Sequence, residues 1–275
     1  MKSFNLLILC ALASLTATAQ QAVKVSYDAV SRNIRNDSLK TEKMLLVADA
    51  GKSLYFNEMS MYVDSLTSTP EGQKKLRAIQ AAAWVTQNAD GSITVNKNRG
   101  NAPDKNIYTY IAKDRKSGDM TVYDKWGDGT YYYTEPFDEM QWEVRADTTA
   151  TILDYECFMA VSDYHGRRWT AWFAPEIPLT DGPWKLHCPG GMILKADTGN
   201  GFSFEATAIE LTGTATPDVY SKDKYSKGTR KKLLADHDYY KNNLTSILSG
   251  QGVTIADPNS MPKFIRDRHA IETDY

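Results

Sequence analysis

The chain has 275 residues, of which 42% are hydrophobic and 24% are charged, and its formal net charge is −2 at pH 7. A chain of this length forms one large domain or two small ones, and its near-neutral charge argues against a nucleic acid as the partner. The 16 tyrosines favour strands and binding surfaces over a helical bundle.

The first 19 residues have the pattern of a secretory signal peptide. Lys2 precedes an apolar run over residues 6–15 that is too short to span a bilayer, and Ala17-Thr18-Ala19 has the small residues of a cleavage site. We therefore expect an exported protein that is periplasmic, associated with the outer membrane or secreted. No later run is apolar enough to cross a membrane, so we expect no membrane-spanning segment.

The N-terminal part of the mature chain predicts strands followed by one helix. Residues 22–30 are rich in β-formers, and Asp49-Ala50-Gly51 predicts the turn of a hairpin over 43–59. Thr69 and Pro70 are typical of a helix start, and strong helix formers extend the predicted helix to residue 84. The side chains expected to pack against the rest of the fold are Leu76, Ile79 and Ala83.

Residues 92–213 predict a series of antiparallel strands joined by short turns. The turns predicted from glycine and polar residues are Lys116-Ser117-Gly118-Asp119, Gly127-Asp128-Gly129, His165-Gly166 and Thr198-Gly199-Asn200-Gly201. Apolar residues recur at every second position from Leu153 to Val161 and again from Trp169 to Phe173. This period of two predicts strands with one buried face, on which Leu153, Tyr155, Cys157, Met159 and Val161 would lie together.

Beyond residue 213 the composition changes. Residues 222–232 carry a basic run that is typical of a solvated helix face, helix formers follow, and the stretch after Gly250 predicts a loosely ordered tail. We therefore expect a signal peptide at 1–19, a β domain at 20–213 and a C-terminal helical extension at 214–275. The predicted fold is mainly β: a curved antiparallel meander sheet, arranged as a half-open barrel or like a sandwich, with one packed helix.

Cys157 and Cys188 are the two cysteines that remain after removal of the signal peptide. Because an exported chain meets an oxidising compartment, we predict a disulfide between them, worth about 3–4 kcal/mol if unstrained. A redox or metal pair is the alternative, although the chain has no C-x-x-C spacing.

Residues 155–197 resemble the GLPGLI family, also called Porph_ging, of exported proteins of Gram-negative bacteria. The likeness rests on a cysteine-bearing strand, on a Gly-Arg pair, on an Ala-Trp strand and on an Ile-Pro step. It also rests on Gly182-Pro183-Trp184-Lys185 and on the region of the motif that names the family. In that motif Pro189 and Gly190 match, whereas His187, Cys188 and Gly191 depart from the family pattern. The second cysteine is therefore not implied by the family. The resemblance implies an envelope protein and no established enzymatic activity.

The motifs of common catalytic and cofactor sites are missing from the sequence. It has no G-x-S-x-G elbow, no H-E-x-x-H pair and no phosphate-binding loop, and nothing selects two of its many carboxylates. We therefore expect no cofactor. If both cysteines were reduced, His165 and His187 could join Cys188 in a copper or zinc site.

The stretch 181–197 concentrates prolines, glycines and a tryptophan ahead of an apolar strand. Such a stiff loop suits a structural lock for a β fold, and it could also form the wall of a preorganised groove. The residues expected to line that groove are Trp184, Trp172, Trp169, Pro189 and Gly190. We expect a non-enzymatic protein that binds a small molecule, a peptide or an envelope protein. The alternatives are a structural or assembly role at the outer membrane, and a metal or redox protein that uses Cys157, Cys188 and His187.

Overall fold

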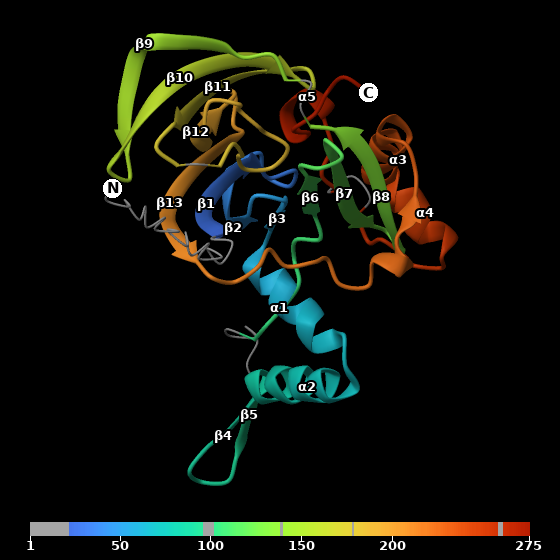
Figure 1. Cartoon of the computed structure of the whole chain (residues 1–275). Helices are drawn as coiled ribbons and strands as arrows, with labels where there is room; N and C mark the ends of the chain where they lie inside the picture. Colours follow the sequence, from blue (N-terminus) through green and yellow to red (C-terminus); the bar gives the residue numbers. More distant parts are fainter. Residues whose placement is uncertain (1–21, 96–101, 138–139, 178, 258–260) are drawn as a thin grey trace, which may run out of the picture.

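The computed structural model describes residues 22–95, 102–137, 140–177, 179–257 and 261–275 (Figure 1). The predicted signal peptide at 1–19 lies outside these residues. Across them, no helix combines the length and the apolar character that crossing a membrane requires.

One twelve-stranded sheet makes up most of the molecule, in the order β14-β8-β7-β6-β3-β2-β1-β13-β12-β11-β10-β9. Its strands are β1 (Ala22–Arg32), β2 (Leu39–Ala48), β3 (Lys52–Phe56), β6 (Tyr110–Asp114), β7 (Asp119–Trp126), β8 (Gly129–Pro136), β9 (Glu143–Ile152), β10 (Tyr155–Tyr164), β11 (Arg167–Ala174), β12 (Met192–Asp197), β13 (Ser203–Thr212) and β14 (Ser226–Lys227). All pairings are antiparallel except that of β14 with β8. The sheet curves strongly without closing into a barrel, so the mainly β prediction is confirmed (Figure 1).

The sheet consists of two meanders joined by one strand pairing. Strands β1, β2, β3, β6, β7 and β8 follow one another on one side, and β13 back to β9 follow one another on the other. The two halves meet where β1 pairs with β13, with Val25 opposite Ile209 and Ala29 opposite Phe204. The first strand of the chain therefore lies in the middle of the sheet.

The turns predicted from sequence are present. Asp49 Oδ1 accepts hydrogen bonds from the backbone N–H groups of Gly51 (2.8 Å) and Lys52 (2.9 Å) and so closes the β2–β3 turn. His165 and Gly166 both have positive φ, at 50° and 75°, as a two-residue hairpin turn between β10 and β11 requires.

The predicted buried face of β10 is correct only in part. Cys157 is buried, but Met159 and Val161 are less so than Ala160 and Ser162, and Leu153 lies in the β9–β10 turn with positive φ. The register of β10 against β9 shifts between Phe158 and Met159. Phe158 pairs with Thr149 whereas Met159 pairs with Arg145, so residues 146–148 of β9 are inserted at this point and the regular ladder is interrupted.

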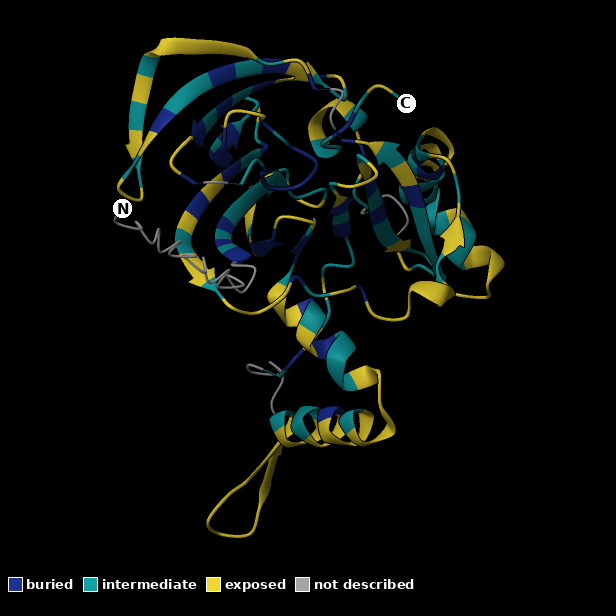
Figure 2. Ribbon diagram, viewed as in Figure 1, coloured by how far each residue is buried: buried dark blue, intermediate teal, exposed yellow. Residues whose placement is uncertain are grey.

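Two helices form an arm that projects from the sheet (Figures 1 and 2). They are α1 (Glu58–Thr67) and α2 (Pro70–Trp84), and the hairpin of β4 (Val85–Gln87) and β5 (Ile93–Val95) follows them. The bounds of α2 agree with the prediction, and Thr69 Oγ1 accepts the hydrogen bond of the Gly72 N–H (3.0 Å) as its cap. Leu76 is the buried residue of α2. The helix against the sheet is α1, and α2 packs on α1.

In its described residues the C-terminal extension has three α-helices and returns to the sheet. They are α3 (Arg230–Asn242), α4 (Leu244–Gly250) and α5 (Arg266–His269), with a short 3-10 helix at Lys222–Lys224. The prediction of a loose tail is wrong for residues 261–275. Arg167 donates to the carbonyls of Asp267 (2.9 Å) and Ala270 (2.5 Å), and the Thr273 N–H donates to the His165 carbonyl (3.0 Å).

Candidate functional site

The Gly-Pro-Trp-Lys loop is held by a buried charge cluster. Asp181 is 0% exposed and its Oδ1 lies 2.6 Å from Lys113 Nζ, which is itself buried on β6. The same Nζ donates to the carbonyls of Gly182 (3.0 Å) and Leu186 (2.8 Å), and Arg115 Nη2 binds Asp181 Oδ2 at 2.6 Å. Burial works to raise the pKa of Asp181, but the charges of Lys113 and Arg115 overcome it, and the pKa is lowered. The stretch is a structural lock between the two meanders.

Close packing explains two of the glycines in this stretch. A Cβ on Gly190 would lie 2.5 Å from the Phe173 ring, and one on Gly191 would lie 2.3 Å from the carbonyl oxygen of Ala174. Both positions therefore need glycine so that the loop can lie against β11.

The structure brings two of the three predicted tryptophans together. The Trp169 and Trp184 rings lie 5.6 Å apart, and both stack near Phe204. Trp169 is 0% exposed and belongs to the core. Of the predicted groove residues, Trp184 lines the cavity described next, whereas Trp169, Trp172, Pro189 and Gly190 do not.

A cavity of about 530 Å³ lies between the curved sheet and the C-terminal extension. Strands of both meanders supply most of its apolar wall, with Met44 from β2, Val122 from β7 and Phe204 from β13. Leu233 of α3 and Ile271 near the C-terminus line it from the other side. Its volume is within the range of small-molecule sites, and its composition is that of such sites: mainly apolar with a few polar groups.

Burial shifts the pKa values of several polar groups around the cavity, among them Asp124, Lys241 and His237. Burial raises the pKa of Asp124 on β7 and lowers the pKa of Lys241 on α3. Burial also lowers the pKa of His237 to about 3, so its imidazole is neutral, and the ring stacks on Trp126 at 5.1 Å. Nothing in the sequence distinguished these residues, because α3 and β7 are more than a hundred residues apart in the chain.

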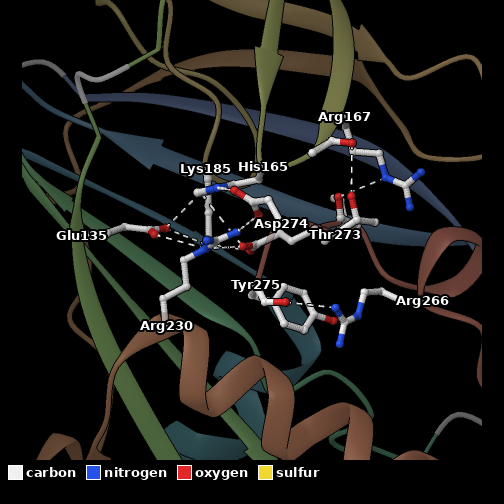
Figure 3. A network of polar contacts seen from close by, with 12 residues as sticks. Glu135, His165, Arg167, Lys185, Arg230, Arg266, Thr273, Asp274 and Tyr275 are labelled. Carbon is white, nitrogen blue, oxygen red and sulfur yellow. Dashed lines mark hydrogen bonds and ion pairs between the residues drawn. The ribbon is translucent and has the colours of Figure 1, made fainter.

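A set of ion pairs, here called the Lys185 clasp, holds the C-terminus over the cavity (Figure 3). Lys185 Nζ, 0% exposed, lies 2.5 Å from Glu135 Oε1 on β8 and 2.6 Å from Glu272 Oε1. Arg230 Nε, at the start of α3, lies 2.6 Å from Glu272 Oε2, and Arg230 also pairs with Asp274. The clasp thus joins both meanders, α3 and the last residues of the chain.

The predicted histidine metal site is not formed as expected. His165 groups with Glu272 and Asp274, whose ligand atoms and its own lie within 4.8 Å of one another. Both carboxylates are already bound by Arg230, and that cation competes with any metal ion there. His187 is not a member of this group, and its ring lies against Phe137 at 5.0 Å.

The structure has no disulfide between Cys157 and Cys188: both are buried thiols of the same hydrophobic core, and the predicted bond is not shown. Burial raises the pKa of Cys157 to about 11 and also raises the pKa of Cys188. Since the thiolate is the reactive form, neither thiol is suited to redox or metal chemistry at neutral pH.

We expect iodoacetamide at pH 8 to modify both thiols at least about tenfold more slowly in the folded protein than in urea, because they are buried and protonated. Intact mass reports the modification. If the two cysteines formed a disulfide, iodoacetamide would not modify them even in urea until a reductant was added. Rapid modification of the folded protein would contradict the burial described here.

No protein-family model and no curated protein matches this chain. Among solved structures, a crystal structure of PNGF-II in space group C2 matches with a TM-score of 0.51 and 14% identity, over 78% of this chain and 32% of that one. A second PNGF-II crystal form, in space group P21, matches with a TM-score of 0.48 and 12% identity, over 78% of this chain and 32% of that one. The complex of MucA and MucB from Pseudomonas aeruginosa matches with a TM-score of 0.23 and 9% identity, over 76% of this chain and 56% of that one. The chain spans about a third of the PNGF-II chains, and the likeness at this identity concerns the fold alone.

Proposed function

We propose that this chain is a non-enzymatic binding protein of the bacterial envelope, of the GLPGLI type, which holds a small molecule in the cavity between the sheet and the C-terminal extension. The observation that carries the proposal is the cavity itself: about 530 Å³, lined mainly by apolar side chains. The signal-peptide pattern and the likeness of residues 155–197 to the GLPGLI family support the location. The acidic groups of the Lys185 clasp are matched by cations, which favours a structural role for them over a catalytic one.

Filling the cavity should abolish binding without disturbing the fold. Val30 on β1 is half-buried and lines the cavity. In a Val30→Trp variant, we expect the neutral apolar dye N-phenyl-1-naphthylamine to lose at least about tenfold in affinity, because the indole occupies the ligand's volume. Fluorescence titration measures this affinity.

Val144→Trp is the matched control, because Val144 is also a valine on a strand, is 49% exposed on β9 and does not line the cavity. We expect this variant to bind the dye as the original protein does. If Val30→Trp and Val144→Trp both bind the dye with equal affinity, the dye binds outside this cavity. A protein that binds no dye at all would favour the alternative of a structural or assembly role.

A further inference from the structure

The inner face of α3 brings a cation to the cavity. Leu233, His237 and Lys241 are spaced four residues apart, so they lie on one face of the helix, and all three line the cavity. β7 lines the cavity as well, through Asp124. The Trp126 ring on the same strand stacks on the His237 ring, so this part of β7 lies against α3.

Lys241 is a cation of the cavity wall that has no carboxylate close to its ammonium group among the described residues. Its Nζ lies 4.6 Å from the centroid of the Phe264 ring, and among the described residues no carboxylate lies within ion-pair distance of it. The other carboxylates nearby are engaged: Asp238 pairs with Arg266 at 2.8 Å, and Glu272 belongs to the Lys185 clasp. Asp124 attracts Lys241 without forming an ion pair.

Burial of this ammonium is costly without a counter-charge. Burial lowers the pKa of Lys241 and raises the pKa of Asp124, so each group is poorly solvated and neither neutralises the other fully. His237 is neutral and adds no charge. An anionic group placed beside Lys241 would supply the missing charge, whereas a cationic group would meet repulsion.

A second cation lies nearby. Lys125 follows Asp124 on β7, is exposed and also lines the cavity, with its Nζ 5.2 Å from the centroid of the Tyr108 ring. Glu42, Asp238 and Glu272 also line the cavity, but apolar side chains supply much of its wall. These apolar side chains include Val30, Met44, Val122, Phe202, Phe204 and Leu233.

Taking the proposed function as its basis, we infer that the ligand is an amphipathic anion: an apolar chain or ring system that ends in one carboxylate-like group. The anionic group lies beside Lys241, and the apolar part extends along the sheet wall. Each methylene buried there increases affinity about fourfold, so shortening a chain by two carbons weakens binding about fifteenfold.

The test compares three ligands with the same chain: dodecanoate, dodecanol and dodecyltrimethylammonium. Each displaces N-phenyl-1-naphthylamine from the full-length mature protein at pH 8, below its micelle concentration. We expect dodecanoate to bind at least about tenfold more tightly than dodecanol, because a charge-assisted hydrogen bond in a poorly solvated site strengthens binding by that order. Decanoate should bind about fifteenfold more weakly than dodecanoate.

The variants assign the preference to Lys241. We expect Lys241→Met to weaken dodecanoate binding far more than dodecanol binding, so that the roughly tenfold preference for dodecanoate is lost, and Lys241→Arg to keep that preference. Lys231→Met, on the exposed side of the same helix, is the matched control and should change neither affinity. Thermal melting shows whether each variant is folded.

Four outcomes would overturn the inference. Equal displacement by dodecanol and dodecanoate, or tighter binding of the quaternary ammonium, would show that the site does not select anions and would leave the proposed function intact. An unchanged preference in Lys241→Met would show that another group selects the anion. Failure of the dye and of all three ligands to bind would contradict the proposed function itself.

Discussion

We expect the Lys185→Met variant to lose about 3–5 kcal/mol of its free energy of unfolding, because removing one partner of a buried ion pair leaves the other without compensation. Lys185 is 0% exposed, and its Nζ lies 2.5 Å from Glu135 and 2.6 Å from Glu272. Arg230 remains to neutralise Glu272, but Glu135 lies 3.5 Å from Arg230 Nε and keeps only this longer contact and His165. Urea unfolding at pH 7, followed by tryptophan fluorescence, measures the loss.

Lys195→Met is the matched control. Lys195 also pairs with a glutamate, Glu205, at 3.2 Å, but both side chains are exposed to solvent. The loss there should be below about 1 kcal/mol. If the clasp acts as described, the double variant Lys185→Met, Glu135→Gln should recover part of the loss, since the buried carboxylate is then neutral. Equal stability of Lys185→Met and the original protein would show that the clasp does not hold the fold.

We expect the Asp181→Asn variant to lose a similar amount, about 3–5 kcal/mol, because it removes the counter-charge of a buried lysine. The side chain keeps its shape, but Lys113 Nζ, buried among the carbonyls of Gly182 and Leu186, loses its carboxylate partner at 2.6 Å. Arg115 loses a partner at the same time. Asp163→Asn is the control, since Asp163 pairs with Arg168 on the surface.

The pH dependence of this loss follows from the lowered pKa of Asp181. The folded carboxylate holds a proton less readily than the unfolded one, so its stabilisation is complete above the ordinary pKa of about 3.9. The stabilisation disappears as pH falls below that value toward the folded pKa. The difference between the original protein and Asp181→Asn should therefore be largest near pH 7 and shrink in acid, when both are unfolded by urea across the pH range. A difference that is constant with pH would contradict the assignment of the charge to Asp181.

Local features of this fold could be predicted from the sequence, and their long-range consequences could not. Thr69 and Pro70 marked the start of α2, and Gly166 marked a hairpin turn, because each acts through its own backbone. The buried face of β10 was predicted correctly at Cys157 but not at Met159 and Val161, since the apolar pattern does not reveal where the register against β9 shifts.

The same limit applies to the candidate site. The loop around Trp184 was predicted as a structural lock from its prolines and glycines, and the structure buries it. Its anchor, Lys113, is 68 positions from Asp181 and appears in the sequence as one lysine among many. Lys241 lies in a stretch predicted only as helical, and the clasp residue Glu272 lies in the predicted loose tail. Neither was singled out, because pairing partners in three dimensions cannot be read from composition.

The β1–β13 pairing, which is the one strand pairing between the two meanders, should form late in folding. Within each meander a strand pairs with the next strand of this sheet along the chain, whereas β1 meets β13 only after most of the chain has been made. Loop-closure entropy makes such a distant pairing slow, so each half should assemble early and the junction late. Until that pairing forms, β1 and β13 are unpaired edge strands, and the hydrogen-bonding groups of each match those of the other. In this state β1 of one chain can pair with β13 of another. Exchange of whole halves between molecules is therefore the misassembly to which this architecture is most prone.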